Sequence, residues 1–426
     1  MKDILFVSML MMWGAVSGCD SVATPPPSST EPSPLRVVSN ETVTDPCTVD
    51  FRDSNLFSDI VPSETGIVLA EAWHDWEACP AATSPNGRVR HYDGRGNLIS
   101  EMPSPFPNAE RFEALVGSQG GFFYVYHPTF REKVVSWVTT DNDVVWTRPL
   151  PTEDLEDVVR IRRSGVSART ESLLLRVGGF DERLIRIGSD GTLDWDVSVD
   201  HMNLARTNMS AAEADDGRLV VATGGSGGTS GRGIDLVQIG RSGDVLWTAD
   251  YDSPYEWETL VPEHIQFLPN GQILMLAKAA GFNFGNLVAV VLNGDGSVAW
   301  RAQTSPRSDE EAFRTVRAVG PTLEEHLWII AEYGTKTCNP SCTGAITTEK
   351  VLLDMEAREF VRTTTPPPTS FSGYGTYGVE SSRYVETSAG TWIAARQYGE
   401  TGYFRSGPQF RFWSSWEVRL LVLNEE

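Results

Sequence analysis

The stretch that decides the fold is Leu236-Val237-Gln238-Ile239-Gly240-Arg241-Ser242-Gly243-Asp244-Val245-Leu246-Trp247. Two short runs rich in apolar and β-branched residues flank a turn of Gly, Ser and Asp. Runs of this length that are bounded by such turns are typical of strands rather than helices. The stretch therefore predicts a β-hairpin whose second strand carries Trp247.

The same hairpin recurs along the chain. Clear copies span residues 134–146, 184–195 and 288–300, and weaker copies span 89–100 and 351–361. The tryptophans that end the four clear copies lie 49, 52 and 53 residues apart. A further short apolar run precedes each hairpin. Four strands in a repeat of roughly 50 residues indicate a blade of a β-propeller.

Counting the middle strand of each repeat gives the number of blades. These strands lie near Ile67, Phe123, Leu174, Val220, Leu274, Trp328 and Ile393. We therefore predict an all-β fold, a single propeller with seven four-stranded blades, and eight blades is the open alternative. The last run, residues 418–423, corresponds to a third strand. Because a missing outer strand leaves an open edge, we expect the segment from Leu35 to Val43 to supply the fourth strand and close the ring.

The hairpins resemble the tryptophan-docking (PQQ-like) repeats of the quinoprotein-like propellers over most of residues 85–365. This resemblance implies that each tryptophan packs between blades and is not part of a ligand cage. Members of the family range from quinone-dependent dehydrogenases to noncatalytic lipoproteins, including one of the outer-membrane barrel-assembly machinery. A quinone enzyme resembling the former would show adjacent cysteines and a dedicated calcium site. Neither motif occurs in the sequence, which counts against a quinone, and we expect no cofactor.

The N-terminus has the pattern of a secretory signal peptide. Lys2 precedes an apolar run from Ile4 to Ser17 of about 14 residues, shorter than the roughly 20 of a membrane-spanning helix. Val16-Ser17-Gly18-Cys19 resembles the lipobox of bacterial lipoproteins, which implies cleavage before Cys19 and palmitate on that residue. The alternative is an ordinary signal peptide in which the cysteine is incidental. We expect a lipid-anchored protein of the cell envelope; Asp20 leaves the inner and outer membranes both open, and the domain would face the periplasm or the exterior.

Composition divides the chain into a signal peptide (1–18), a lipidated cysteine with a Pro/Ser/Thr-rich linker (19–35) and the propeller (36–426). The linker cannot bury a core and is typical of an extended tether. The formal net charge is −22, and no Lys/Arg cluster occurs, so we expect no binding to nucleic acid. An acidic surface attracts cationic partners; adaptation to a salty habitat is the other interpretation, and we favour it.

Four cysteines remain beyond Cys19. An even number in an exported protein predicts disulfides. We expect Cys338 to pair with Cys342 across a tight loop and Cys47 to pair with Cys79. A metal knuckle is the alternative, but no further Cys or His lies at ligand spacing, and we predict no metal site.

Ligands of propellers usually bind where the loops that enter the innermost strands converge on the central channel. One such loop carries the candidate binding rim Asp250, Tyr251, Asp252, Tyr255 and Trp257. Acids beside aromatic rings suit a cation, a sugar or a basic peptide; the alternative is an ordinary solvated loop.

No catalytic constellation is evident. The six histidines show no ligand spacing. Gly224-Gly225-Ser226-Gly227-Gly228 matches G-x-S-x-G, but we expect a flexible loop between two strands there, without the strand, elbow and helix that this chemistry needs. We therefore expect a membrane-anchored, noncatalytic binding or scaffolding module, for an envelope protein or for a small ligand on the rim. The alternative is a propeller enzyme acting on a small molecule or glycan in the central channel.

Overall fold

The structure is a computed structural model. It describes residues 35–42, 47–50, 56–73, 86–118, 120–129, 131–150, 155–159, 161–163, 172–177, 183–199, 209–227, 232–253, 259–280, 285–305, 311–319, 326–338, 342–362, 369–372, 376–386, 392–406 and 409–425. The chain divides into two compact units, Met1–Pro32 and Ser33–Glu426. The signal peptide, Cys19 and most of the linker lie outside the described residues, so these expectations stay predictions.

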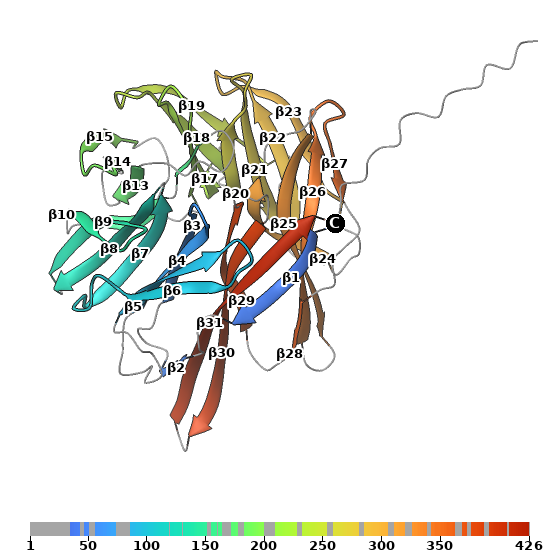
Figure 1. Cartoon of the computed structure of the whole chain (residues 1–426). Helices are drawn as coiled ribbons and strands as arrows, with labels where there is room; N and C mark the ends of the chain where they lie inside the picture. The colour runs from blue at the N-terminus through green and yellow to red at the C-terminus, as the bar shows by residue number, and fades with distance from the viewer. Residues whose placement is uncertain are drawn as a thin grey trace, which may run out of the picture. The chain divides into compact units, whose positions relative to one another are not determined.

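The described residues contain strands and no helix, in an all-β propeller (Figure 1). The first three sheets each contain four antiparallel strands. Sheet 1 consists of β3 (Leu56–Pro62), β4 (Gly66–Trp73), β5 (Gly87–Asp93) and β6 (Leu98–Pro103). Sheet 2 consists of β7 (Arg111–Ser118), β8 (Gly121–Thr129), β9 (Glu132–Thr139) and β10 (Val144–Pro149). Sheet 3 consists of β11 (Leu155–Val159), β13 (Ser172–Val177), β14 (Arg183–Gly188) and β15 (Leu193–Ser198).

Sheet 4 consists of β12 (Ile161–Arg163), β16 (Met209–Glu213), β17 (Leu219–Gly227), β18 (Gly233–Ile239) and β19 (Val245–Tyr251). Sheet 5 consists of β20 (Thr259–Phe267), β21 (Ile273–Ala280), β22 (Gly285–Leu292) and β23 (Val298–Gln303). Sheet 6 consists of β24 (Glu311–Val319), β25 (His326–Cys338), β26 (Cys342–Asp354) and β27 (Glu359–Arg362), with β28 (Thr369–Ser372) paired to β26. Sheet 7 consists of β29 (Thr376–Glu386), β30 (Trp392–Ser406), β31 (Gln409–Glu425) and β1 (Leu35–Thr42), with β2 (Cys47–Asp50) paired to β31.

The N-terminal strand completes the last sheet, as predicted. β1 pairs antiparallel with β31, from Leu35 opposite Glu425 to Thr42 opposite Arg419. The C-terminal strand is thus third in its sheet, and the N-terminal strand is the fourth. Contacts between β29 and β3 link this sheet to sheet 1. The number of blades itself stays a prediction.

Three strands depart from the expected four-stranded pattern: β2 and β28, which pair with sheets 7 and 6, and β12. β12 pairs in parallel with β16, so sheet 4 contains a fifth strand. β11 ends at Val159 and β12 begins at Ile161, so the chain passes from the edge of sheet 3 to the edge of sheet 4 within two residues. β12 is only three residues long and directly follows another strand, so its sequence has no hydrophobic pattern that would predict it.

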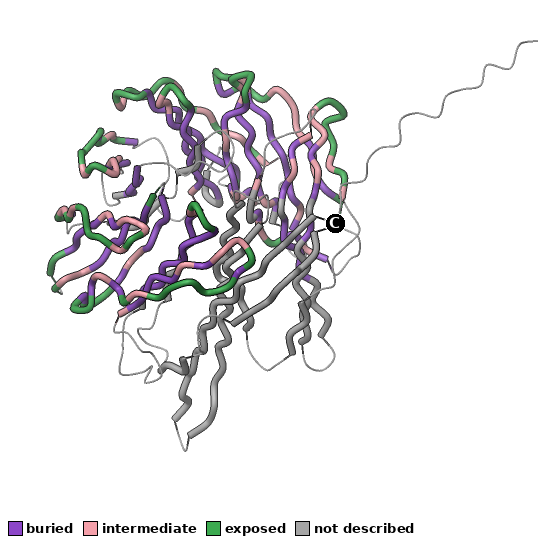
Figure 2. Tube along the Cα trace, viewed as in Figure 1, coloured by how far each residue is buried: buried purple, intermediate pink, exposed green. Residues whose placement is uncertain are grey.

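Apolar side chains fill the spaces between neighbouring sheets. In β21, Met275 and Ala277 pack in the cluster shared with sheet 4, whereas Leu274 and Leu276 pack in the cluster shared with sheet 6. Both faces of a middle strand are therefore covered. This explains why these strands read as continuous apolar runs, and Figure 2 shows them buried while the turns are exposed.

The third and fourth strands of sheets 1 to 5 are joined by turns of one kind, at residues 93–97, 139–143, 188–192, 240–244 and 293–297. The fourth residue of each turn has a positive φ: Gly96, Asn142, Gly191, Gly243 and Gly296. We call this end of the sheets the turn end. The opposite end, where the chain leaves a fourth strand for the next sheet, is the loop end.

The tryptophans of the repeat dock on these turns. Trp247 donates a hydrogen bond from Nε1 to Gly294 O in the next sheet, at 2.9 Å. A Cβ on Gly296 would lie 3.0 Å from the Trp247 ring, so glycine lets the ring pack closely on the turn. Trp146 lies in the same way on the turn of sheet 3, with its Nε1 bonded to Ser189 O. The tryptophans therefore pack between sheets, as the resemblance implied.

A β-bulge precedes each docked tryptophan. The residue before it (Val145, Asp194 or Leu246) has no partner in the third strand. Bulges re-aim the side chain that follows, here toward the neighbouring sheet. In sheet 1 the bulge is present but Ser100 takes the place of the tryptophan. The link to sheet 2 is instead a hydrogen bond from Asn142 Nδ2 to Pro103 O at 2.8 Å.

Within the described ranges, no helix has the length and apolar character to cross a membrane.

Candidate binding site

The candidate rim lies where sheet 4 leads into sheet 5. Asp250 and Tyr251 end β19 and Asp252 follows, whereas Tyr255 and Trp257 lie outside the described residues. Asp250 and Asp252 are exposed. Tyr251 is half-buried against the cluster between sheets 4 and 5; burial raises the pKa of its hydroxyl, an effect that Arg301 of β23 opposes. Tyr251 therefore takes part in the sheet interface, and a binding role for the rim stays a prediction.

The predicted disulfides concern positions whose side chains lie outside the described residues. The backbone places Cys338 directly opposite Cys342 in the β25–β26 hairpin. Cys47 is in β2, opposite Trp416, and Cys79 is not described. Both pairings remain predictions.

The G-x-S-x-G stretch corrects one expectation. β17 continues through Gly227, so Ser226 lies in a strand and not in a loop. The strand pairing extends this far because Gly227 is opposite Gly233 of β18. The next described element is a strand, so the elbow and helix of a serine hydrolase do not follow.

Three histidines have side-chain partners within their own sheets. His127 Nε2 lies 2.7 Å from Glu113 Oε1, and His264 Nε2 lies 3.0 Å from Gln266 Oε1. His326 Nε2 lies 3.2 Å from Asp354 Oδ2. Among the described residues, no group of three His, Cys, Asp or Glu side chains is arranged to hold a metal ion.

A cleft of about 360 Å³ opens at the turn end between sheets 4 and 5. Its walls are two turns that join first to second strands, lined by Ala214, Asp215, Asp216, Arg218, Phe267, Leu268, Pro269 and Gly271. Our sequence reading did not identify this cleft, because the two turns are more than 50 residues apart. The signal that could have found it is the equivalent position of two Gly-containing turns in neighbouring repeats.

The charges in the cleft are only partly paired. Arg218 Nε lies 2.7 Å from Asp216 Oδ2, and its guanidinium carbon lies 5.6 Å from the centre of the Phe267 ring. Burial raises the pKa of Asp216, but hydrogen bonds from the Arg218 backbone and side chain outweigh this and lower it. Asp215 is exposed and has no hydrogen bond or ion pair with a described residue. The cleft thus offers apolar walls and one unpaired carboxylate, which suits a group that is partly apolar and positively charged.

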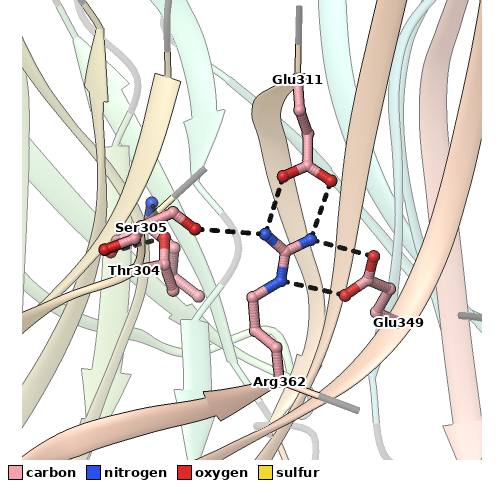
Figure 3. A network of polar contacts seen from close by, with 6 residues as sticks. Thr304, Ser305, Glu311, Glu349 and Arg362 are labelled. Carbon is pink, nitrogen blue, oxygen red and sulfur yellow. Dashed lines mark hydrogen bonds and ion pairs between the residues drawn. The ribbon is translucent and has the colours of Figure 1, made fainter. Parts of the chain in front are cut away.

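Other charged side chains form ion pairs within a sheet. In sheet 6, Arg362 forms a bidentate pair with Glu311, with Nη1–Oε2 2.8 Å and Nη2–Oε1 3.0 Å (Figure 3). Its Nε and Nη2 also bond the two oxygens of Glu349 at 3.1 and 2.9 Å. The guanidinium carbon lies 3.7 Å from the centre of the Tyr333 ring. Hydrogen bonds and one stacked ring engage the guanidinium, and the Arg362 side chain is only 10% exposed.

Sheet 1 contains a comparable network. Arg88 Nε lies 2.8 Å from Glu71 Oε2, and Arg90 Nε lies 2.6 Å from Glu101 Oε2. Glu71 is fully buried. Two cations and two carboxylates balance each other, so this network also acts in stabilising its sheet.

A known family model matches part of the chain. Residues 85–258 match the family model described as outer membrane protein assembly factor BamB. No curated protein matches the chain. Among solved structures, a protein of unknown function from Bacteroides caccae is 12% identical with a TM-score of 0.35, covering 74% of this chain and 94% of its own. The polysaccharide lyase Uly1 is 9% identical with a TM-score of 0.44, covering 90% and 99%.

A third structure, the PL25 ulvan lyase, is 10% identical with a TM-score of 0.43 and covers 84% of this chain and 92% of its own. These likenesses are too distant to carry an argument about activity. The family match spans the hairpin of sheet 1 and the tryptophan hairpins of sheets 2 to 4. Over residues 85–258 the chain is thus similar to the PQQ-like repeats of this family.

Proposed function

We propose that the chain is a lipid-anchored lipoprotein of the cell envelope whose propeller is a noncatalytic module that binds another protein. The observation that carries this proposal is the location of the exposed apolar side chains. Among the described residues, every exposed large apolar side chain lies on a fourth strand: Leu98, Ile99, Val144, Val145, Leu193, Val245, Leu246, Val298 and Val361.

These positions suit a protein partner for two reasons. A fourth strand is the edge of its sheet, with unpaired backbone groups that can accept an added strand. Most of these residues lie at the bulge or directly before it, at the exposed start of the fourth strand. Contiguous exposed apolar side chains mark interaction surfaces, and the adjacent pair Val245 and Leu246 is the candidate contact on sheet 4.

The cleft and the edge of sheet 4 form one surface. The Arg241 side chain lies over Gly217, with its Cγ 3.0 Å from where a Cβ would be. Gly217 belongs to the turn that walls the cleft, and Arg241 to the turn that leads to Val245 and Leu246. A partner segment with apolar residues and one basic side chain would bind along the edge and place the cation at Asp215.

The anchor supports a partner within the envelope. A lipid on Cys19 and a Pro-rich linker would hold the propeller near a membrane, where a binding module meets membrane-bound proteins at high effective concentration. The match to an outer membrane assembly factor over residues 85–258 supports the same class of function.

The test is capture of proteins from envelope extracts by the full-length chain after cross-linking. We expect the double variant Val245→Lys/Leu246→Lys to lose its partner while its melting temperature is unchanged, because both side chains are exposed. Thr248→Lys is the matched control, since Thr248 is an exposed polar residue of the same strand. Equal capture by both variants, or no captured protein with the unaltered chain, would contradict the proposal.

The anchor is tested separately. Cys19→Ser is expected to abolish palmitate labelling and to move the protein from the membrane to the soluble fraction without lowering its melting temperature. Continued labelling would show that Cys19 is not the lipidation site.

A further inference from the structure

Sheet 7 contains a hairpin that is longer than the strands beside it (Figure 1). β30 pairs with β31 along its whole length. β29 flanks β30 only as far as Thr401, and β1 and β2 flank β31 only from Trp413 onward. In the part of the chain that the structure describes, residues 402–406 and 409–412 therefore pair only with each other. We call these two segments the tip strands.

The tip strands are rich in aromatic residues and in arginine. Their four aromatic residues and two arginines are Tyr403, Phe404, Phe410, Phe412, Arg405 and Arg411. They contain no acidic residue, although the formal net charge of the chain is −22. The charge of the tip strands is thus opposite in sign to that of the whole protein, and an anionic partner would be attracted to them.

The register places aromatic residues on both faces of the tip strands. Residues directly opposite each other in an antiparallel pair share a face, and successive residues of a strand alternate between faces. One face has Tyr403 opposite Phe412, and beside this pair Phe410 has an arginine opposite it. The other face has Phe404 opposite Arg411. Each face therefore combines at least one aromatic residue with one arginine.

The neighbouring sheet shows that a hairpin of this kind does not require aromatic residues. In sheet 6, β25 and β26 also extend beyond the strand beside them, because β24 flanks β25 only as far as Thr335. Residues 335–346 of that hairpin contain no aromatic residue. A two-stranded hairpin is only marginally stable in water. The aromatic residues of the tip strands therefore suit a contact outside the sheet.

We propose that the tip of the β30–β31 hairpin inserts into the headgroup region of an anionic phospholipid bilayer. Aromatic residues favour this region, and anionic headgroups attract each arginine. A bilayer surrounds an inserted ribbon and contacts both of its faces, whereas a protein surface or a glycan that binds one face leaves the other in water. Insertion stays shallow, because the edges of a two-stranded ribbon have unpaired backbone groups that the hydrocarbon core excludes.

The residue types also favour a lipid surface over a sugar. Three of the four aromatic residues are phenylalanines, which have no polar group to hydrogen-bond a sugar hydroxyl. An anionic bilayer offers negative charge and apolar area together, which matches the arginines and the phenylalanines at once.

This contact is separate from the proposed anchor and from the proposed protein-binding surface. The hairpin joins a second strand to a third and so lies at the loop end. β1, which follows the linker, enters sheet 7 at the opposite end of β31, with Leu35 opposite Glu425. The cleft and the apolar edge of sheet 4 are at the turn end. The proposal therefore holds or fails independently of both.

The test is the fluorescence of an environment-sensitive dye on Ser406→Cys of the full-length protein mixed with vesicles. Thr248→Cys is the control, because Thr248 is exposed on the fourth strand of sheet 4. Unaltered protein treated with the dye corrects for labelling of the five native cysteines. We expect phosphatidylglycerol vesicles to cause a blue shift at position 406 only, and phosphatidylcholine vesicles to cause a much smaller one. No shift at position 406, or an equal shift at position 248, would overturn the proposal.

Arg405→Gln/Arg411→Gln, made in the labelled protein, measures the electrostatic part. Two arginines near an anionic surface contribute enough that the lipid concentration for half of the maximal shift should rise about thirtyfold. Arg95→Gln/Arg241→Gln is the matched control, because it removes the same charge from two exposed residues of the turn end. This control should leave the lipid concentration unchanged. Equal effects of the two double variants would mean that net charge, and not the hairpin, determines binding.

Phe404→Ser and Phe410→Ser test the two faces separately. Each variant should reduce the blue shift, because a bilayer contacts both faces, and its melting temperature distinguishes weaker binding from unfolding. A full shift in either variant would mean that the hairpin binds through one face only, which contradicts insertion. A shift with dextran sulfate, a soluble polyanion, that equals the shift with vesicles would identify the ligand as an anionic polymer and would also overturn the proposal.

Discussion

The two ends of the sheets contain contacts of different kinds. At the turn end of sheet 4, Trp247 lies on Gly296 of the next sheet and bonds Gly294 O. At the loop end of sheet 6, Arg362 binds two carboxylates of its own sheet, Glu311 and Glu349 (Figure 3). Its guanidinium carbon also lies 3.7 Å from the centre of the Tyr333 ring. The first contact recurs from sheet to sheet, and the second is particular to its place. The ion pair of Arg186 with Glu213, at 2.6 Å, shows that charged links also occur near the turn end.

The two kinds of contact respond differently to substitution. Docking of an aromatic ring removes apolar area from water and contributes in proportion to that area. A buried ion pair contributes little net free energy, because desolvation offsets the attraction. Removing one partner of such a pair is nevertheless costly, since the other charge stays buried. We therefore expect the largest loss of unfolding free energy when one partner of a buried ion pair is removed, although the intact pair contributes little net free energy.

Arg362→Met should have the largest effect. Its loss leaves Glu311 and Glu349 without their shared cation, and the Glu349 side chain is 0% exposed. We expect the free energy of unfolding to fall by about 3–5 kcal/mol, measured by urea denaturation at pH 7.

Arg183→Met is the control for this change. Arg183 and Asp196 form an ion pair at 2.6 Å with side chains that are 39% and 36% exposed. Solvent screens such a pair, so the loss should be below about 1 kcal/mol. Similar losses in the two arginine variants would show that burial is not what makes the sheet 6 network sensitive.

Gly243→Ala tests the docking at the turn end. The new Cβ would lie 2.9 Å from Trp195 Cβ, and the residue has a φ of +93°. Strain in the left-handed region costs about 1–2 kcal/mol, and crowding of the tryptophan adds about 1–3 kcal/mol. Gly271→Ala isolates the first part, because its φ is +80° and nothing lies within 4 Å of the new Cβ. Equal losses of unfolding free energy in the two variants would mean that docking does not require glycine.

The same contrast explains what the sequence could predict. The repeat consists of apolar runs and tryptophans at a similar spacing, which the sequence shows directly. All seven expected middle strands are present, from β4 around Ile67 to β30 around Ile393. The pairing of residues 35–42 with the last strand followed from an edge that needed covering. Two-residue crossings such as that from β11 to β12 have no such pattern.

The charged sites could not be predicted in this way. Arg362 and Glu311 are 51 residues apart, and Arg362 and Glu349 are 13 apart, with no local motif to mark any of them. Their meeting depends on where each strand begins and on which face each residue occupies.

The contact of Glu113 with His127 and Lys133 is expected to make the stability of the protein depend on pH. Burial raises the pKa of Glu113, but Lys133 and His127 outweigh burial and lower it below its usual value. A carboxyl group with a lowered pKa stabilises the folded state above its unfolded pKa, and this stability is lost as the pH falls through the folded pKa. Glu113→Gln should therefore lose about 1–2 kcal/mol at pH 7 and less at each step below about pH 4.5.

Urea denaturation of both proteins from pH 7 to pH 3 measures this difference. Lys133→Met is a useful companion, because it removes the cation and leaves Glu113 beside His127 alone. A difference between the unaltered protein and Glu113→Gln that stays constant down to pH 3 would show that the carboxylate charge is not what stabilises this contact.

The smallest expected effect comes from adding a docking contact where the chain lacks one. Ser100 occupies the tryptophan position of sheet 1, and the turn that it faces has Asn142 with a φ of +71° in place of glycine. Ser100→Trp alone should not stabilise the protein, because the Asn142 side chain fills the docking place and bonds Pro103 O. Combined with Asn142→Gly, the same substitution should gain about 1 kcal/mol from the buried ring, less the lost hydrogen bond.

The coupling between the two changes is the quantity to measure, through urea denaturation of both single variants and the double variant. Additive effects would mean that the glycine of the turn and the tryptophan of the preceding sheet are independent features of the repeat.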